Sequence, residues 1–239
     1  MKSRINIKST KHSKIIILTS VFVCVFILLF VSSNKFLDPD FGWHLKMGEY
    51  ILGHGGVPET DPFSYTMASF PFIDHEWLTN VYFYKLYNSI GKFGLASLFS
   101  CYLLFALFIS VRNTMSRRIN QKIYKYSVLL LIPLVYPVFT AYFGVRPQVQ
   151  SWFLFSVLFH FLFRKQIWDK YKFLLVPFMI FWTNLHGSFS AGVITILAYI
   201  VLRTLRKRKL QLSDLLLGVL VILATFANAY GVRIWHEVW

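Results

Sequence analysis

Long apolar stretches separated by short polar ones constrain the fold of this chain more than any other feature. Seven such segments can be drawn, at residues 15–33, 94–111, 126–143, 148–163, 173–185, 188–202 and 214–228. Stretches of this kind are typical of transmembrane helices, which need about 20 residues to cross the bilayer core. Because residues 173–202 are long for one helix and short for two, we expect two short helices that meet near residues 182–189, with Gly187 at the break.

The composition favours the same class of protein. The chain has 239 residues, of which 56% are hydrophobic and only 15% are charged, whereas soluble domains carry about 25% charged residues. Its net charge of +15 would suggest nucleic-acid binding in a soluble protein. In a membrane protein it indicates basic cytoplasmic loops, so we expect no nucleic-acid partner. Cys24 and Cys101 both lie in apolar segments, which argues against a disulfide framework or a cysteine metal site.

The basic residues are distributed unevenly among the loops. Seven crossings with the N-terminus inside place four basic clusters, with 19 of the 25 lysines and arginines, on the cytoplasmic side. The clusters are Lys2, Arg4, Lys8, Lys11 and Lys14; Arg112, Arg117, Arg118, Lys122 and Lys125; Arg164, Lys165, Lys170 and Lys172; and Arg203, Arg206, Lys207, Arg208 and Lys209. We therefore predict an all-α, polytopic integral membrane protein with about seven transmembrane helices. Its first external loop spans residues 34–93 and carries interfacial helices.

A cleavable signal peptide is the alternative for the first segment. Its basic N-terminal region fits, but the apolar run is long and "VSSNK" is a poor cleavage site. In both cases residues 34–93 lie outside the cytoplasm.

The first external loop begins with two carboxylates, Asp38 and Asp40, followed by His44. Two such carboxylates can hold a divalent cation, or one of them can act as a general base. The alternative is structural, because Asp before Pro is a common helix N-cap and residues 41–52 read as an interfacial helix. Capping explains Asp38 better than it explains Asp40.

Other polar residues with chemical potential lie in the same loop and in the later external turns. Asp74, His75 and Glu76 suit acid–base or metal chemistry, or Asp74 caps a helix over residues 75–89. Arg146, which precedes Gln148 in the string Arg-Pro-Gln, suits a lipid phosphate or an ion pair with a loop carboxylate.

Asn184 and His186 lie at the tip of the two short helices. Polar residues at membrane depth are functional candidates, although hydrogen bonding between helices is the structural alternative. No P-loop, nucleophile-elbow, HExxH or dinucleotide-binding motif is present.

The strings "DPDFGWHLKMGEYIL", "GGVPETDPFSYT", "DHEWL", "RPQ", "WTNLHGSFSAG" and "NAYGVRIW" occur in this order. Together they resemble bacterial multi-pass membrane proteins related to the GT-C glycosyltransferases, over nearly all of residues 36–239. Two positions depart from the family pattern, namely Gly42, where a Trp is usual, and Ala229, where a Pro is usual. The resemblance implies a single GT-C-like module over residues 1–239, and the sequence ends soon after the seventh segment. Because family members continue through further helices, we expect that a C-terminal portion is missing.

The resemblance implies a polyprenyl-phosphate-linked sugar as donor and chemistry at the external face of the bacterial inner membrane. It implies that Asp40, or else Asp38, is the catalytic base or a ligand of a divalent cation such as Mg or Mn, and that Arg146 contacts the lipid phosphate. The remaining implied substrate-binding residues are His44, Asp74, His75, Glu76, Gln148, Asn184 and His186. The expected function is glycosyl transfer, and the alternatives are a lipid-linked saccharide flippase and a non-catalytic subunit or fragment.

Overall fold

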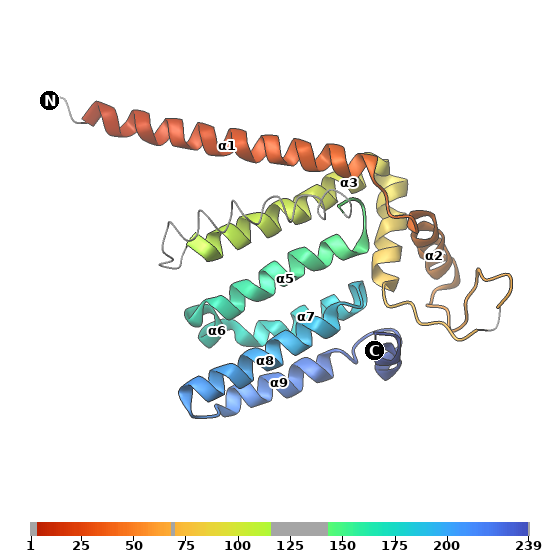
Figure 1. Cartoon of the computed structure of the whole chain (residues 1–239). Helices are drawn as coiled ribbons and strands as arrows, with labels where there is room; N and C mark the ends of the chain where they lie inside the picture. The colour runs from red at the N-terminus through yellow and green to blue at the C-terminus, as the bar shows by residue number, and fades with distance from the viewer. Residues whose placement is uncertain (1–3, 68–69, 116–142, 239) are drawn as a thin grey trace.

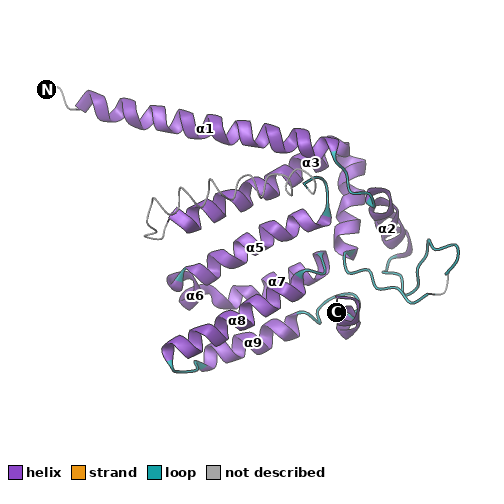
Figure 2. Ribbon diagram, in the orientation of Figure 1, coloured by secondary structure: helices purple, strands orange, loops and turns teal. Residues whose placement is uncertain are grey.

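The computed structural model describes residues 4–67, 70–115 and 143–238. In these ranges the regular elements are helices, and only two isolated β-bridges occur (Figure 2). The elements are α1 Arg4–Lys35, α2 Phe41–His54, α3 Trp77–Met115, α5 Pro147–Phe163, α6 Lys165–Tyr171, η1 Lys172–Leu174, α7 Leu175–Leu185, α8 Phe189–Lys207, α9 Leu212–Ala224, η2 Gly231–Arg233 and α10 Ile234–Val238. The prediction of an all-α fold is confirmed.

The long helices lie roughly side by side, so the molecule has two distinct ends (Figure 1). One end carries α2, the loop before α3 and the break between α7 and α8; we call it the loop end. The opposite end carries residues 164–172 and 203–214, and we call it the basic end after its lysines and arginines. The described residues of the first loop thus lie at the opposite end from two of the four basic clusters.

Helix α3 consists of two arms that meet at Gly91. This residue has φ 64° and ψ −170°, a conformation that glycine adopts readily and other residues avoid. The first arm lies at the loop end beside α2, and the second arm runs along the other long helices (Figure 1). The predicted helix over 75–89 corresponds to the first arm, and the predicted segment 94–111 lies within the second.

The prediction of seven transmembrane helices is only partly confirmed. Segment 126–143 lies almost entirely outside the described residues, and each of the other six predicted segments overlaps a helix. By length and composition, only the helices Trp77–Asn113 and Phe189–Lys207 in the described ranges are long and apolar enough to cross a membrane. Helix α7 has 11 residues and α9 has 13. At 1.5 Å per residue they reach about 16 and 20 Å, less than the roughly 30 Å of a bilayer core.

The break between α7 and α8 lies where the sequence predicted it. Helix α7 ends at Leu185 and α8 begins at Phe189, so the two short helices meet within residues 182–189. Gly187 belongs to this break, and a Cβ there would lie 2.8 Å from Val238 Cγ1 and 3.0 Å from the His75 ring. The break is therefore packed closely against the first loop and the C-terminal segment.

Helix α2 is anchored through one face. Phe41, His44, Met47 and Ile51 are buried at intervals of three or four residues, and Phe41 packs against Phe83 of α3 with ring centroids 6.0 Å apart. His44 lies on the same buried face. The packing of α2 therefore directs one predicted site residue toward the first arm of α3.

Candidate functional site

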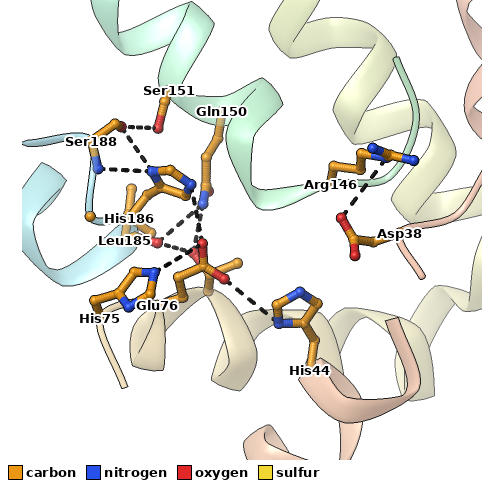
Figure 3. A network of polar contacts seen from close by, with 12 residues as sticks. Asp38, His44, His75, Glu76, Arg146, Gln150, Ser151, Leu185, His186 and Ser188 are labelled. Carbon is orange, nitrogen blue, oxygen red and sulfur yellow. Dashed lines mark hydrogen bonds and ion pairs between the residues drawn. The ribbon is translucent and has the colours of Figure 1, made fainter. Parts of the chain in front are cut away.

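A backbone pairing brings Asp38 and Arg146 together. The Asp38 amide donates to the Val145 carbonyl oxygen at 3.2 Å, and the Val145 amide donates to the Phe36 carbonyl oxygen at 3.2 Å. Gly144 permits this approach, because a Cβ there would lie 2.2 Å from the Phe36 oxygen. Arg146 Nε consequently lies 3.9 Å from an Asp38 carboxylate oxygen (Figure 3).

The two carboxylates at the start of α2 have different surroundings. Asp38 Oδ1 accepts a hydrogen bond from the Asp40 amide at 2.9 Å, and the Asp38 carbonyl oxygen accepts one from Phe41, so Asp38 shapes the turn into the helix. Asp40 occupies the N-cap position but its side chain makes no capping hydrogen bond and is exposed. This agrees with the interpretation that capping explains Asp38 better than Asp40. It leaves the Asp40 carboxylate accessible to a ligand.

Glu76 lies among three histidines, and we call Glu76, His44, His75 and His186 the Glu76 cluster (Figure 3). Glu76 Oε1 lies 3.1 Å from His186 Nε2 and 3.7 Å from His75 Nε2, and Oε2 lies 3.8 Å from His44 Nδ1. Glu76 is only 8% exposed. Four residues named from the sequence therefore meet, although they come from α2, the loop before α3 and the break between α7 and α8.

Hydrogen bonding and burial define the protonation of the closest pair. The Ser188 amide donates to His186 Nδ1 at 3.0 Å, so the neutral ring carries its proton on Nε2, which faces Glu76 Oε1. Burial raises the pKa of Glu76 to about 8, with a further contribution from Asp74, and burial lowers the pKa of His186 to about 3. At neutral pH both groups are therefore mostly uncharged, and their contact is a hydrogen bond rather than an ion pair.

Asp74 connects to the same cluster through Asn80. Asn80 Nδ2 donates to Asp74 Oδ2 at 2.7 Å, and Asn80 Oδ1 accepts from His44 Nδ1 at 2.7 Å. His44 Nε2 is then an acceptor in the neutral ring, and burial lowers the pKa of His44. Asp74 Oδ1 also accepts from the Glu76 amide at 3.0 Å, which agrees with the capping alternative. Burial raises the pKa of Asp74 to about 6.

Asn184 and Gln148 were also predicted as site residues, and neither belongs to the Glu76 cluster. Asn184 Oδ1 accepts from Trp77 Nε1 at 2.9 Å, and its Nδ2 donates to the Ala227 carbonyl oxygen at 2.9 Å. Both ends of this amide thus join segments of the fold, as the structural alternative expected. Gln148 is exposed near the start of α5.

Gln150 and Thr79 are buried polar residues at this site that the sequence analysis did not identify. Gln150 Nε2 donates to Thr79 Oγ1 at 2.6 Å, and the Thr79 hydroxyl donates to the Leu185 carbonyl oxygen at 2.6 Å. Spacing gives a signal for both, because Thr79 follows Glu76 by three residues and Gln150 follows Arg146 by four.

The predicted divalent-cation site at Asp38 and Asp40 has few potential ligands. In the described ranges, no group of three or more His, Cys, Asp or Glu side chains is arranged to hold a metal ion. Asp38 and Asp40 offer two carboxylates, and Asp38 already contacts Arg146. We assign no chemical step to a metal, and the divalent cation stays a prediction.

A second buried polar cluster lies at the basic end, and sequence analysis did not identify it. This Asp214 cluster consists of Asp214, Asp169, Lys172, Arg203 and Trp168. Asp214, which is 1% exposed, accepts from Arg203 Nε at 3.0 Å and from Trp168 Nε1 at 3.3 Å, and it also pairs with Lys172. Arg203 pairs in turn with Asp169. Two acids thus balance two bases where α6, η1, α8 and α9 meet.

Comparison with known proteins finds no matching family model, no matching curated protein and no matching solved structure.

Proposed function

We propose that this chain is a multi-pass protein of the bacterial inner membrane that transfers a sugar from a polyprenyl-phosphate donor to an acceptor hydroxyl at the external face, as GT-C enzymes do. One observation carries the proposal. At the loop end, first-loop acids and histidines meet Arg146 and His186, which come from much later in the chain. The Asp214 cluster at the basic end, by contrast, consists of balanced ion pairs.

Exposed apolar side chains support the location in a membrane. Leu28, Phe93, Leu202 and Leu205 are each 64 to 70% exposed, on α1, α3 and α8. Apolar side chains that are exposed on three long helices suit contact with lipid better than contact with water. The positive-inside rule favours the basic end on the cytoplasmic side and the loop end, with the polar first loop, outside.

The transfer reaction requires a base and a group that stabilises the leaving phosphate. The acceptor oxygen forms a bond to the anomeric carbon and loses its proton, while the bond from that carbon to the phosphate oxygen breaks. Asp40 takes the proton, because its carboxylate is exposed and makes no capping hydrogen bond. Arg146 contacts the polyprenyl phosphate and offsets its developing charge. Asp38 is a positioning residue for Arg146.

The Glu76 cluster then binds the sugar. Protonated Glu76 offers a hydroxyl donor, and the neutral histidines offer both donors and acceptors. Uncharged groups suit sugar hydroxyls, because they form hydrogen bonds without leaving a buried charge uncompensated.

The test is transfer of labelled glucose from undecaprenyl-phosphate-glucose, with membranes from cells that lack this chain as the source of acceptor. Label should move from the organic phase to the acceptor fraction with the purified chain. Asp40→Asn should lower the rate by about 10²-fold or more, the usual contribution of a general base. Arg146→Gln should weaken binding of undecaprenyl phosphate.

Asp61→Asn is the matched control, because Asp61 is a first-loop carboxylate whose Oδ1 accepts from the Phe63 amide at 2.9 Å, a role that Asn also fills. It should retain the full rate. Equal transfer by Asp40→Asn and Asp61→Asn would remove Asp40 from the catalytic role. Binding of undecaprenyl phosphate without any transfer would favour the flippase or the non-catalytic subunit.

A further inference from the structure

A groove is lined by residues of α5 and α8 near the basic end, and no member of the Glu76 cluster is among its lining residues. Its volume is about 880 Å³, toward the upper end of the roughly 300–1,000 Å³ typical of ligand pockets. Most of its wall is apolar. The apolar and aromatic lining residues are Phe159, Leu162 and Phe163 of α5 and Ile194, Ala198, Tyr199 and Leu202 of α8.

Basic side chains border the same groove. Lys165 begins α6, Arg206 and Lys207 end α8, and all three are exposed. Arg203 also lines the groove, but Asp214 and Asp169 already balance its charge. No acidic side chain is among the lining residues in the described part of the chain. The groove thus combines an apolar wall with three positive charges that its own lining does not neutralise.

We propose that this groove binds an anionic phospholipid, with its acyl chains against Phe159, Ile194 and Leu202 and its headgroup at Lys165, Arg206 and Lys207. Lysine and arginine both bind phosphate, lysine as a point charge and arginine through its planar fork. Basic pockets between helices at the cytoplasmic side are suited to anionic headgroups.

The position of the charges selects the occupant. The polyprenyl donor of the proposed function needs its phosphate at the loop end, beside Arg146, whereas the basic residues of the groove lie at the opposite end. A phospholipid of the cytoplasmic leaflet places its phosphate at the basic end. The inference rests on the membrane location in the proposed function but not on the transfer reaction.

Native mass spectrometry of the full chain tests the proposal. The chain is released from detergent micelles that contain equimolar phosphatidylglycerol and phosphatidylcholine, and the lipid that stays bound is identified. The wild type should retain phosphatidylglycerol in preference to phosphatidylcholine. A triple variant, Lys165→Gln, Arg206→Gln and Lys207→Gln, should lose about tenfold or more of that preference. The matched control is Lys170→Gln, Arg208→Gln and Lys209→Gln, which removes the same charges at the same end but outside the groove lining; it should keep the preference.

A second variant tests the apolar wall. Ala198→Trp places a large side chain in the groove without changing its charge, and it should also reduce phosphatidylglycerol retention about tenfold. Equal losses in the two triple variants, or full retention by Ala198→Trp, would overturn the proposal. Transfer of labelled glucose by the groove variants separates the two hypotheses, because the groove lies away from Asp40 and Arg146. A transfer-competent chain with no lipid preference overturns only this inference, and a lipid-selective chain without transfer overturns only the proposed function.

Discussion

The Glu76 cluster and the Asp214 cluster are each centred on a buried acid and join distant segments, yet their charges are arranged in opposite ways. Asp214 and Asp169 are balanced by Lys172 and Arg203. Glu76 has only histidines within ion-pairing distance in the described part of the chain. One cluster is therefore neutral because its charges cancel, and the other is mostly neutral because burial shifts the pKa values of its members.

This difference separates a structural role from a functional one. In a balanced ion-pair network the partners are fixed within the fold. Loss of one partner therefore leaves a buried charge without a counter-charge and without water to solvate it. An uncharged acid among histidines can gain or lose a proton and can exchange hydrogen bonds with a ligand. We therefore expect substitutions in the Asp214 cluster to affect stability most, and substitutions at the Glu76 cluster to affect ligand binding most.

Asp214→Ala should have the largest effect on stability. It leaves Lys172 and Arg203 without their shared buried counter-charge, which should cost about 3–5 kcal/mol. Thermal unfolding in detergent measures the change. Asp169→Ala is the control, because the Asp169 side chain is 43% exposed and should contribute at most about 1 kcal/mol. An Asp214→Ala variant as stable as Asp169→Ala would contradict a structural role for this cluster.

The pH dependence of stability should reveal the raised pKa of Glu76. The pKa rises from 4.5 in the unfolded chain to about 8 in the fold. The contribution of Glu76 to the free energy of unfolding is therefore greatest below pH 4.5 and is lost as the pH rises from 4.5 through 8. His186 acts in the opposite sense below pH 6.5, because its pKa is lowered. Between pH 6.5 and 9 the wild type should therefore lose about 2 kcal/mol.

Glu76→Gln keeps the shape of the side chain and removes its ionisation. Unfolding of this variant between pH 6.5 and 9 should lack the loss seen in the wild type. The same slope in both proteins would show that Glu76 is not the group that titrates.

Gly144→Ala should have a smaller effect that is confined to the Asp38–Arg146 pair. The new methyl group would lie 2.2 Å from the Phe36 carbonyl oxygen and should push the two segments apart, at a cost of about 1–3 kcal/mol. Binding of undecaprenyl phosphate should weaken as Arg146 shifts. Gly53→Ala in α2 has nothing within 4 Å of its Cβ and should bind normally. Equal binding of undecaprenyl phosphate by the two variants would contradict the proposed contact between Arg146 and the phosphate.

Apolar stretches predicted the positions of the described long helices, but only two helices in the described ranges are long and apolar enough to cross a membrane. Segment 173–185 reads as a span from its apolar residues, yet η1 occupies residues 172–174 and α7 keeps only 11 residues. Residue count nevertheless predicted the break before Phe189, because two helices in 30 residues leave little length for each. Local length limits are thus readable from sequence, whereas exact helix ends depend on tertiary packing.

The site was predictable in part. His44, His75, Glu76 and His186 were named as polar residues of the first loop and of the tip between the two short helices. No spacing rule brings residue 186 to residue 76, because that contact depends on how α7 packs against α3. Gln148 was chosen where Gln150 is the buried residue, since the two point to different faces of α5. The Asp214 cluster was missed because a count of basic residues treats Arg203 and Lys172 as solvated.

The central claim is that the loop end faces outside and the basic end faces the cytoplasm, and labelling with a membrane-impermeant maleimide tests it most directly. In a chain whose two cysteines, Cys24 and Cys101, are replaced by alanine, a single cysteine is introduced at Tyr65, which is 97% exposed, or at Lys209. Tyr65→Cys should react in intact cells, and Lys209→Cys should react only after lysis. Reaction of Lys209→Cys in intact cells, or protection of Tyr65→Cys until lysis, would contradict the account.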